Sequence, residues 1–267
     1  MIYCIRNSFF DINLAKLYEG ERFVAFGNYL RGLTDQYFLN ALKVSLIITF
    51  SVIILELLIG FFLALVLNKP LERRLGKFRR LFRTMAILPV VLPPVVVGLM
   101  WRFMFQYTGV INYILNTVGI DPVDWTNRIT GIIKIIIVVV WQNVPFSFLL
   151  ILTGLQSVPQ DLEDAVMVDG ATIWQKIINL YIPFLRPIIF LILAIRTMDS
   201  LRLFDEAYIL TGGGPGRSTE TMSLFIYTNS FSFFHIGYGS ALAIILLIFL
   251  MIITIFYMRL IYKREEL

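Results

Sequence analysis

Four ionisable residues in or next to long apolar stretches of the sequence are candidate functional residues, because a charge in such a stretch is costly and faces either protein or a water-filled path. They are Glu56, Lys134, Arg196 and Asp199. Arg196 and Asp199 are three positions apart, so on a helix they share one face and are placed to form an ion pair. Glu56 is expected to satisfy a polar group on a neighbouring helix. These residues predict polar contacts inside an apolar environment rather than a reaction centre.

Residues for metal binding are scarce. Cys4 is the one cysteine and His235 the one histidine, which excludes a disulfide framework and a metal site built from either residue type. His235 stands in the aromatic run FSFFHIGY and is expected to be an interfacial residue rather than a proton relay. We therefore expect no metal, no cofactor and no covalent chemistry in this chain.

The segment TGGGPGRST has the glycine content of a phosphate-binding loop but not its pattern. Thr211 stands where the first glycine belongs, Pro215 interrupts the loop, and Arg217 replaces the lysine. The segment is therefore expected to be a turn that allows close backbone approach, to a neighbouring helix or to a docked protein. The residues assigned to this turn are Gly212, Gly213, Gly214 and Pro215.

The amino-acid composition indicates the environment that surrounds these residues. The chain has 267 residues, of which 58% are hydrophobic and 15% charged, and its mean hydropathy is +0.79. A soluble domain has roughly 45–50% apolar residues, so the surplus must face something other than water. This excludes a soluble enzyme, and the 23 Phe and 12 Tyr exclude a disordered chain.

Apolar stretches near the length of a membrane span recur along the chain. A helix needs about 20 mostly apolar residues to cross a bilayer. The fourth stretch is the shortest and contains Pro183 and Pro187, so it is expected to borrow length from flanking helix. The five predicted spans are Leu39–Leu67, Ala86–Gln106, Ile132–Gly154, Ile182–Met198 and Ala241–Tyr262.

Basic residues predict the orientation of the spans. They concentrate in Lys69–Arg83 and in the carboxy-terminal tail, and both segments are expected to be cytoplasmic. Alternation then places 155–181 inside and both 107–131 and 199–240 outside. The basic segment Lys69–Arg83 lies beside two spans, so anionic lipid is a better partner for it than nucleic acid, and no nucleic-acid partner is expected.

The amino-terminal residues raise a question of topology. With five spans, residues 1–38 lie outside, yet MIYCIRNSFF is too short, and is interrupted by Arg6, to act as a signal that translocates them. We expect a sixth span before Met1; a short tail that is translocated without help is the alternative. The predicted fold is thus an all-α integral membrane bundle. Its parts are an extracytoplasmic segment (1–38), a membrane domain (39–262) and a cytoplasmic tail (263–267).

The predicted inner loop at about 155–183 has helical periodicity of its own. The apolar residues Leu162, Ala165, Val166, Val168 and Ala171 are interspersed with the acidic residues Asp161, Glu163, Asp164 and Asp169. Gly170 is expected to end a first short helix, and Thr172 to help cap a second one that runs towards Pro183. A helix, a glycine corner and a second helix on the inner face of a membrane predict a docking surface.

This loop resembles the EAA loop of binding-protein-dependent ABC importer permeases, and the chain is most similar to the carbohydrate-uptake, maltose-permease-like subfamily. The resemblance extends over nearly the whole chain from Phe23 onward. One departure is Asp164, which stands in place of the first Ala of E-A-A. The residues that carry the resemblance are Glu163, Asp164, Ala165, Asp169, Gly170, Ala171, Leu180 and Pro183 in the loop, and elsewhere Leu67, Asn68, Arg83, Thr84, Pro89, Trp101, Gly109, Ile111, Asn112, Gly154–Pro159 and Leu210–Pro215.

The resemblance implies partners. It implies a second, related permease subunit, an ATPase dimer that holds ATP and magnesium, and an extracytoplasmic solute-binding protein, in a bacterial or archaeal cytoplasmic membrane. The segment Gln160–Pro183 would dock to the ATPase, where Glu163 is expected to pair with a basic residue. The glycine turn would lie near the binding protein. A solvated acidic face remains the alternative for the loop carboxylates.

The resemblance also implies a sugar site on the helix that follows the loop. The Arg196 face, extended by Asp199 and Arg202, is the leading candidate, with a structural ion pair as the alternative. Aromatic and amide side chains on other spans suit sugar hydroxyls and ring faces, although Trp is also common at bilayer interfaces. These are Trp101, Trp141 and Asn143. Because Arg196 and Arg202 are basic, an anionic solute such as a polyol phosphate is an alternative to a neutral sugar. The alternative classes of protein are a secondary transporter and a structural membrane anchor.

Overall fold

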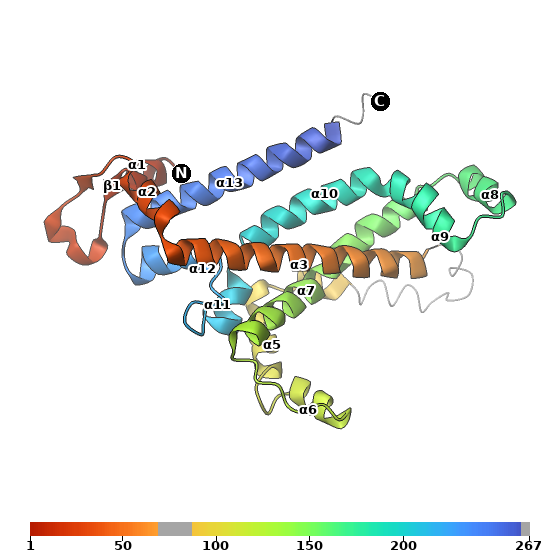
Figure 1. Cartoon of the computed structure of the whole chain (residues 1–267), viewed down its shortest axis with the longest axis horizontal. Coiled ribbons are helices and arrows are strands. Elements are labelled where there is room, and N and C mark those ends of the chain that lie inside the picture. The colour runs from red at the N-terminus through yellow and green to blue at the C-terminus, as the bar shows by residue number, and fades with distance from the viewer. Residues whose placement is uncertain (69–86, 263–267) are drawn as a thin grey trace. The chain divides into compact units, whose positions relative to one another are not determined.

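The computed structural model describes residues 1–68 and 87–262 (Figure 1). The basic segment Lys69–Arg83 and the tail 263–267 lie outside the described residues. Within those residues the chain is almost entirely helical, apart from one two-stranded antiparallel ladder that pairs Phe10 with Phe23. The elements are α1 (Ile2–Ser8), β1 (Phe10–Asp11), η1 (Leu14–Glu19), β2 (Arg22–Phe23), α2 (Gly27–Thr34), α3 (Gln36–Val66), α5 (Pro94–Met104), α6 (Val110–Thr117), α7 (Arg128–Gln156), α8 (Gln160–Val168), α9 (Ile173–Lys176), η2 (Ile177–Tyr181), α10 (Ile182–Leu201), α11 (Asp205–Thr211), α12 (Met222–Tyr227), η3 (Thr228–Ser232) and α13 (Ile236–Tyr262).

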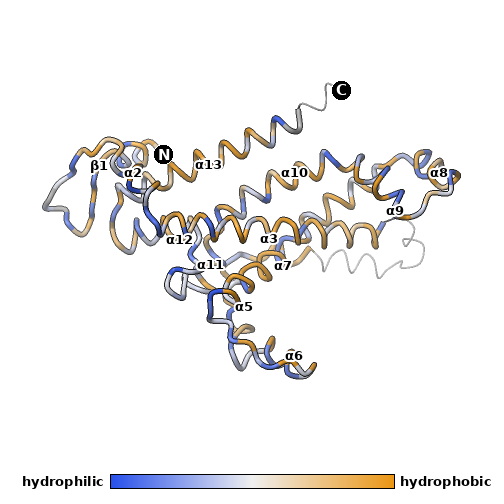
Figure 2. The backbone as a smooth tube through the Cα atoms, in the orientation of Figure 1, coloured by the Kyte–Doolittle hydropathy of each residue, from blue (hydrophilic) through white to orange (hydrophobic). Residues whose placement is uncertain are grey.

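Four helical runs in the described residues are long and apolar enough to cross a membrane. They are Gln36–Val66, Arg128–Gln156, Ile173–Leu201 and Ile236–Arg259. The shortest has 24 residues, which is about 36 Å at 1.5 Å per residue and exceeds a hydrocarbon core of about 30 Å. Figure 2 shows apolar residues along most of α3 and α13. The predicted all-α membrane fold is confirmed.

The predicted span Ala86–Gln106 is wrong as a continuous helix. A short helix covers 87–91 and ends there. Leu92 and Pro93 are not helical, and α5, which follows them, has only 11 residues. Pro93 and Pro94 have no N–H to donate, so the helical hydrogen bonds cannot continue through them. The amide of Gln142 on α7 donates to the Leu92 carbonyl at 3.2 Å, which satisfies an irregular backbone group as an apolar environment requires.

The fourth span is extended by flanking helix, as predicted. α9, the π-helical segment η2 and α10 follow one another without a break, so the run Ile173–Leu201 has 29 residues. Pro183 near the start of α10 lacks an N–H and its ring clashes with the carbonyl four residues before it, and the widened π turn lies directly before it. Pro183 therefore modifies this helix rather than ending it.

The described residues divide into two compact units. The first consists of Met1–Ser51, Pro94–Val138 and Thr197–Phe256, and the second of the described residues of Val52–Pro93, Val139–Arg196 and Tyr257–Leu267. The first unit has an apolar core in which α3, α12 and α13 meet, and its α5 packs on α11, with Gly98 against Ile209. The core residues are Phe38, Ala41, Met222, Phe225, Tyr238, Leu242 and Leu246.

The second unit has a core between α3, α7 and the run from η2 into α10. Small residues allow close approach there: Gly60 of α3 lies against Ser147 and Phe148 of α7, and Gly154 of α7 lies against Leu185 of α10. The buried residues are Ala64, Leu67, Phe148, Ile151, Leu152, Leu155, Val158, Ile177, Tyr181, Leu185 and Ile192. This core joins the predicted docking loop to two spans.

Candidate functional site

The loop between α7 and α10 has the predicted helix, glycine corner and capped second helix. α8 ends at Val168, and Gly170 has a left-handed backbone with φ +68°. The amide of Ala171 then donates to the carbonyl of Val166 at 3.2 Å, closing the end of α8. Figure 1 shows α8 and α9 together at one end of α10. The left-handed corner explains why a glycine stands at this position.

The second helix of the loop begins with a capping box. The backbone amide of Gln175 donates to the Thr172 hydroxyl oxygen at 3.3 Å, and the Thr172 amide donates to the Gln175 side-chain oxygen at 2.7 Å. The predicted cap at Thr172 is confirmed. Sequence reading missed Gln175, although a glutamine three residues after a threonine is the signature of this motif.

Glu163 forms a buried polar contact inside the loop. Its residue is 5% exposed, and its carboxylate accepts hydrogen bonds from Lys176 Nζ at 3.2 Å and from the Tyr181 hydroxyl at 3.3 Å. The carboxylate therefore bonds within its own chain, and its predicted pairing with a basic residue of the ATPase stays a prediction. The physical reason is burial, because a carboxylate in the core of the second unit needs partners close by. Glu163 holds α8 to the run Ile173–Leu201.

Three large apolar side chains of the loop are exposed, and together they are called the exposed apolar patch. Val168 is 87% exposed, Ile173 77% and Trp174 74%. Asp164, Ala165 and Asp169 are exposed as well, and Ala171 is half-buried. The Asp164 carboxylate accepts a hydrogen bond from Gln160 at 3.0 Å within α8, so the extra charge in place of an alanine does not disturb its own helix.

Arg196 and Glu56 form a buried ion pair in the second unit. Arg196 Nε lies 2.7 Å from one oxygen of Glu56, and an Arg196 terminal nitrogen lies 2.9 Å from the other. The side chains are 7% and 0% exposed. The prediction that Glu56 satisfies a polar group on a neighbouring helix is confirmed. Arg196 is thus buried against a carboxylate, and its predicted contact with a solute stays a prediction.

Asp199 bonds to Arg202, the third residue of the predicted solute face. Its carboxylate accepts a hydrogen bond from Arg202 at 2.9 Å, and both side chains are exposed. Of the three residues on the predicted solute face, Asp199 and Arg202 are thus accessible, and Arg196 is buried. The sequence separation of three residues between Asp199 and Arg202 is the signal that identifies this second pair.

The aromatic and amide candidates are partly enclosed. Trp101 is buried and stacks on Phe105, whose ring contacts Trp125. The side chain of Asn143 donates to the Val139 carbonyl of its own helix at 2.9 Å, and Trp141 is half-buried. Their predicted contact with a solute stays a prediction.

The glycine segment forms a turn after α11, as predicted. Gly212 ends α11 with φ +59° and Gly213 has φ +83°. A side chain at Gly213 would lie 3.2 Å from Glu220 and 3.3 Å from Leu224, so the expected close approach to a neighbouring element is found at this glycine. Thr219 fixes the turn by donating to the Gly214 carbonyl at 2.8 Å. Pro215 is exposed.

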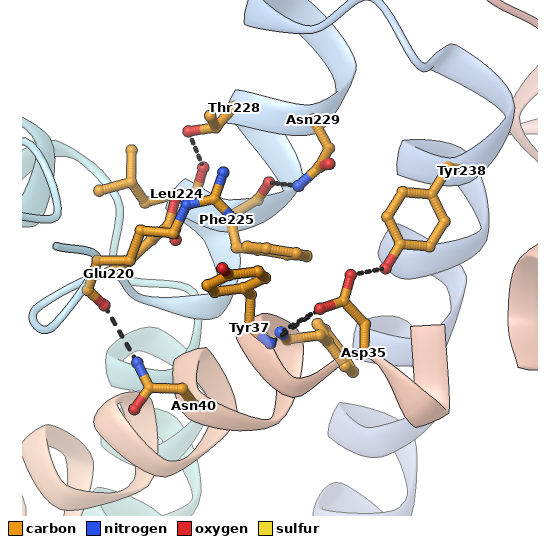
Figure 3. A network of polar contacts seen from close by, with 11 residues as sticks. Asp35, Tyr37, Asn40, Glu220, Leu224, Phe225, Thr228, Asn229 and Tyr238 are labelled. Atoms are coloured by element: carbon orange, nitrogen blue, oxygen red, sulfur yellow. Dashed lines mark hydrogen bonds and ion pairs between the residues drawn. The ribbon is translucent and has the colours of Figure 1, made fainter. Parts of the chain in front are cut away.

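A polar network attaches this turn to the first turns of α3 (Figure 3). The Asn40 amide donates to the Arg217 carbonyl at 3.1 Å, and the Arg217 guanidinium lies over the Tyr37 ring. Asp35 accepts from the Tyr37 backbone at 2.8 Å and from the Tyr238 hydroxyl at 2.8 Å (Figure 3). Sequence reading missed Asp35, although an aspartate just before a helix is a common cap.

Comparison with known proteins finds matches over most of the chain. Residues 56–266 match the family model described as binding-protein-dependent transport system inner membrane component. The trehalose/maltose transport system permease protein MalF of Thermococcus litoralis is 36% identical over 239 residues, which is 89% of this chain and 79% of that protein. The sulfoquinovosyl glycerol transport system permease protein SmoG of Agrobacterium fabrum is 34% identical, over 98% of this chain and 83% of that protein.

A solved structure has the same fold. A chain from a bacterial ABC transporter involved in the import of the acidic polysaccharide alginate has a TM-score of 0.82 at 21% identity, covering 98% of this chain and 89% of that chain. The spans, the helical loop between α7 and α10 and the family match lead to one conclusion. The chain belongs to the family of binding-protein-dependent transport system inner membrane components, and it is a multi-pass membrane protein.

Proposed function

We propose that this chain is the permease subunit of an ATP-driven importer of a sugar or an oligosaccharide. The observation that carries the proposal is the loop of α8 and α9, which presents an exposed apolar patch at Val168, Ile173 and Trp174 and continues without a break into a membrane-length helix. Relatives named as permeases of trehalose/maltose and trehalose transport systems support a sugar as the solute.

The subunits proposed around this chain follow from the family. A second permease completes the solute path, and an ATPase dimer with ATP and magnesium docks at Gln160–Pro183 on the inner face of a bacterial or archaeal cytoplasmic membrane. A solute-binding protein delivers solute on the outer face, close to the exposed Pro215 of the glycine turn. Closure of the ATPase moves the loop and reorients the spans, which gives alternating access; the chain performs no covalent chemistry.

The charge distribution favours a neutral sugar. The two arginines that left an anionic solute open each bind a carboxylate, Arg196 with Glu56 and Arg202 with Asp199, so neither adds net positive charge to the path. An anionic, sugar-like solute is the second candidate, because relatives include permeases of sulfoquinovosyl glycerol and sn-glycerol-3-phosphate transport systems. A secondary transporter would need paired broken helices in two symmetric halves, and the sequence has no such repeat.

The test is purification of the chain from its native membrane, followed by identification of its partners. The proposal expects an ATPase and a second permease to co-purify. In proteoliposomes, neutral disaccharides delivered with the binding protein should stimulate ATP hydrolysis more than glycerol phosphate or a glucuronide. A chain that transports solute with no ATPase present contradicts the proposal.

A further inference from the structure

One helical run carries two polar attachments that lie at opposite ends of it. In the run Ile173–Leu201, Lys176 binds Glu163 of α8, and Arg196 binds Glu56 of α3. Twenty residues separate Lys176 from Arg196, which is about 30 Å along a helix and matches the thickness of a hydrocarbon core. The two attachments therefore connect the docking loop to α3 over the depth of a membrane.

The first attachment makes the loop rigid with respect to this run. Glu163 accepts hydrogen bonds from both Lys176 and Tyr181, which belong to α9 and η2. The acceptor is buried, so water does not compete for these bonds. A displacement of α8 is thereby passed to the start of the run rather than absorbed at the Gly170 corner.

The second attachment fixes the orientation of the run against α3. The guanidinium of Arg196 binds both oxygens of Glu56, a two-point contact that allows little rotation. Stability alone does not account for this pair, because replacing both members of a buried ion pair with apolar residues often leaves a protein as stable as before. A role in holding a particular geometry does account for it.

Apolar packing closes the space between the two attachments. Gly154 of α7 lies directly against Leu185 of α10, with no room for a side chain. Leu185 and Ile192 of the run belong to the same buried core as Ala64 of α3. All these residues lie in one compact unit, so the loop, residues 173–196 of the run and residues 52–66 of α3 are packed as a single body.

We infer that Glu56 and Arg196 are positioning residues that make α3 move with the run Ile173–Leu201, so that movement of α8 reaches α3 across the membrane. The inference rests on the proposed function, since it takes the loop of α8 and α9 as the place where the ATPase acts. It adds a second, specific contact through which ATPase movement reaches the solute path.

The first experiment compares variants of the assembled transporter in proteoliposomes, measuring thermal stability and solute transported per ATP hydrolysed. The double variant Glu56→Leu with Arg196→Met removes both charges of this ion pair together, and thermal stability should stay close to that of the wild type. Solute transported per ATP should fall by about fivefold or more. The matched control is Arg6→Gln with Glu21→Gln, which removes an exposed Arg–Glu ion pair far from the run in sequence and should transport like the wild type.

A second measurement keeps the ion pair intact and does not depend on assembly of that variant. In a Cys4→Ser background, spin labels are placed at two exposed positions, Ile54 of α3 and Leu191 of α10. The distance between the labels should be the same in the nucleotide-free transporter and in the vanadate-trapped one, with loss of ATPase activity confirming that trapping occurred.

The outcomes separate the two ideas. If the wild type shows no ATP-dependent uptake, the proposed function fails. If the wild type transports but the double variant keeps its ratio of solute to ATP, or if the distance between the labels changes on trapping, the role of Glu56 and Arg196 is overturned while the proposed function stands.

Discussion

Lys176 of α9 donates a hydrogen bond to Glu163 of α8 across the Gly170 corner, with Nζ 3.2 Å from a carboxylate oxygen. Both side chains are mostly buried. The two short helices of the docking loop are therefore held together by charge as well as by the chain connection. The Tyr181 hydroxyl adds a third group to this contact.

The first prediction concerns this contact. Glu163→Gln removes the charge that Lys176 pairs with, and a hydrogen bond to a charged, buried group contributes about 1.5–3 kcal/mol. We expect a clearly lower melting temperature for the purified protein in detergent, measured by thermal unfolding. Asp164→Asn is the matched control, because Asp164 is exposed and its carboxylate accepts a hydrogen bond from Gln160 within its own helix. Equal melting temperatures for the two variants would contradict a stabilising role for Glu163.

The second prediction concerns the corner itself. A side chain at Gly170 would meet no atom within 4 Å, so the effect of a substitution comes from its backbone, which has φ +68°. A left-handed conformation costs a residue with a side chain roughly 1–2 kcal/mol. Gly170→Val should therefore destabilise the loop and lower transport per ATP hydrolysed. Gly170→Asn should be milder, since asparagine tolerates this conformation. Wild-type transport by an assembled Gly170→Val complex would show that the corner has no part in coupling.

The features that the sequence predicted correctly are those set by neighbouring residues. The corner at Gly170 and the cap at Thr172 follow from local rules on backbone conformation and helix ends. The proline pair Pro93 and Pro94 carried a local signal too, since two successive residues without an N–H break a helix. Composition alone did not reveal the break, because the stretch is apolar throughout.

The features that the sequence did not predict depend on residues distant along the chain. Arg196 has a nearby carboxylate at Asp199, but the partner that buries it is Glu56, 140 positions away. Likewise, whether Glu163 faces solvent or the core depends on the packing of α8 against the run Ile173–Leu201. Helical spacing gives the residues that share a face, and tertiary packing decides which residue meets that face.

The third prediction concerns the attachment of the amino-terminal segment. Gly237 of α13 lies against the Phe10 carbonyl so closely that a side chain would collide with it, and its amide donates to the Ile12 carbonyl at 3.3 Å. Gly237→Ala should push β1 away at a cost of about 1–3 kcal/mol. The expected result is faster tryptic cleavage after Lys16 or Arg22.

The control for this prediction is Gly27→Ala in the same segment. A side chain at Gly27 would meet Val24 at 3.5 Å, which is ordinary contact, and alanine suits the start of a helix. Cleavage of this variant should match the wild type. If Gly237→Ala is cleaved no faster than Gly27→Ala, the segment is not held by the contact between Gly237 and Phe10.

The fourth prediction concerns pH. Burial of Glu220 raises the pKa of its carboxyl above the usual value, although Arg217, 3.8 Å away, acts in the opposite direction. A carboxyl with a raised pKa in the folded protein contributes stability below the pKa of the unfolded chain, about 4.3, and loses it as pH rises through the raised value. Glu220→Gln should therefore gain stability relative to the wild type between pH 4 and pH 8, as measured by melting temperature.

The pKa of Asp124 is shifted in the opposite direction to that of Glu220, so the same experiment on Asp124 should give the opposite change of stability with pH. Hydrogen bonds from the hydroxyl and the amide of Thr126 lower the pKa of its carboxyl. That contribution is present above the usual aspartate pKa of about 3.9 and is lost as pH falls through the lowered value. Asp124→Asn should therefore lose stability relative to the wild type as pH rises from 3 to 8. Two variants with the same slope against pH would contradict burial as the cause at Glu220, because burial and hydrogen bonding to the charged form shift a carboxyl pKa in opposite directions.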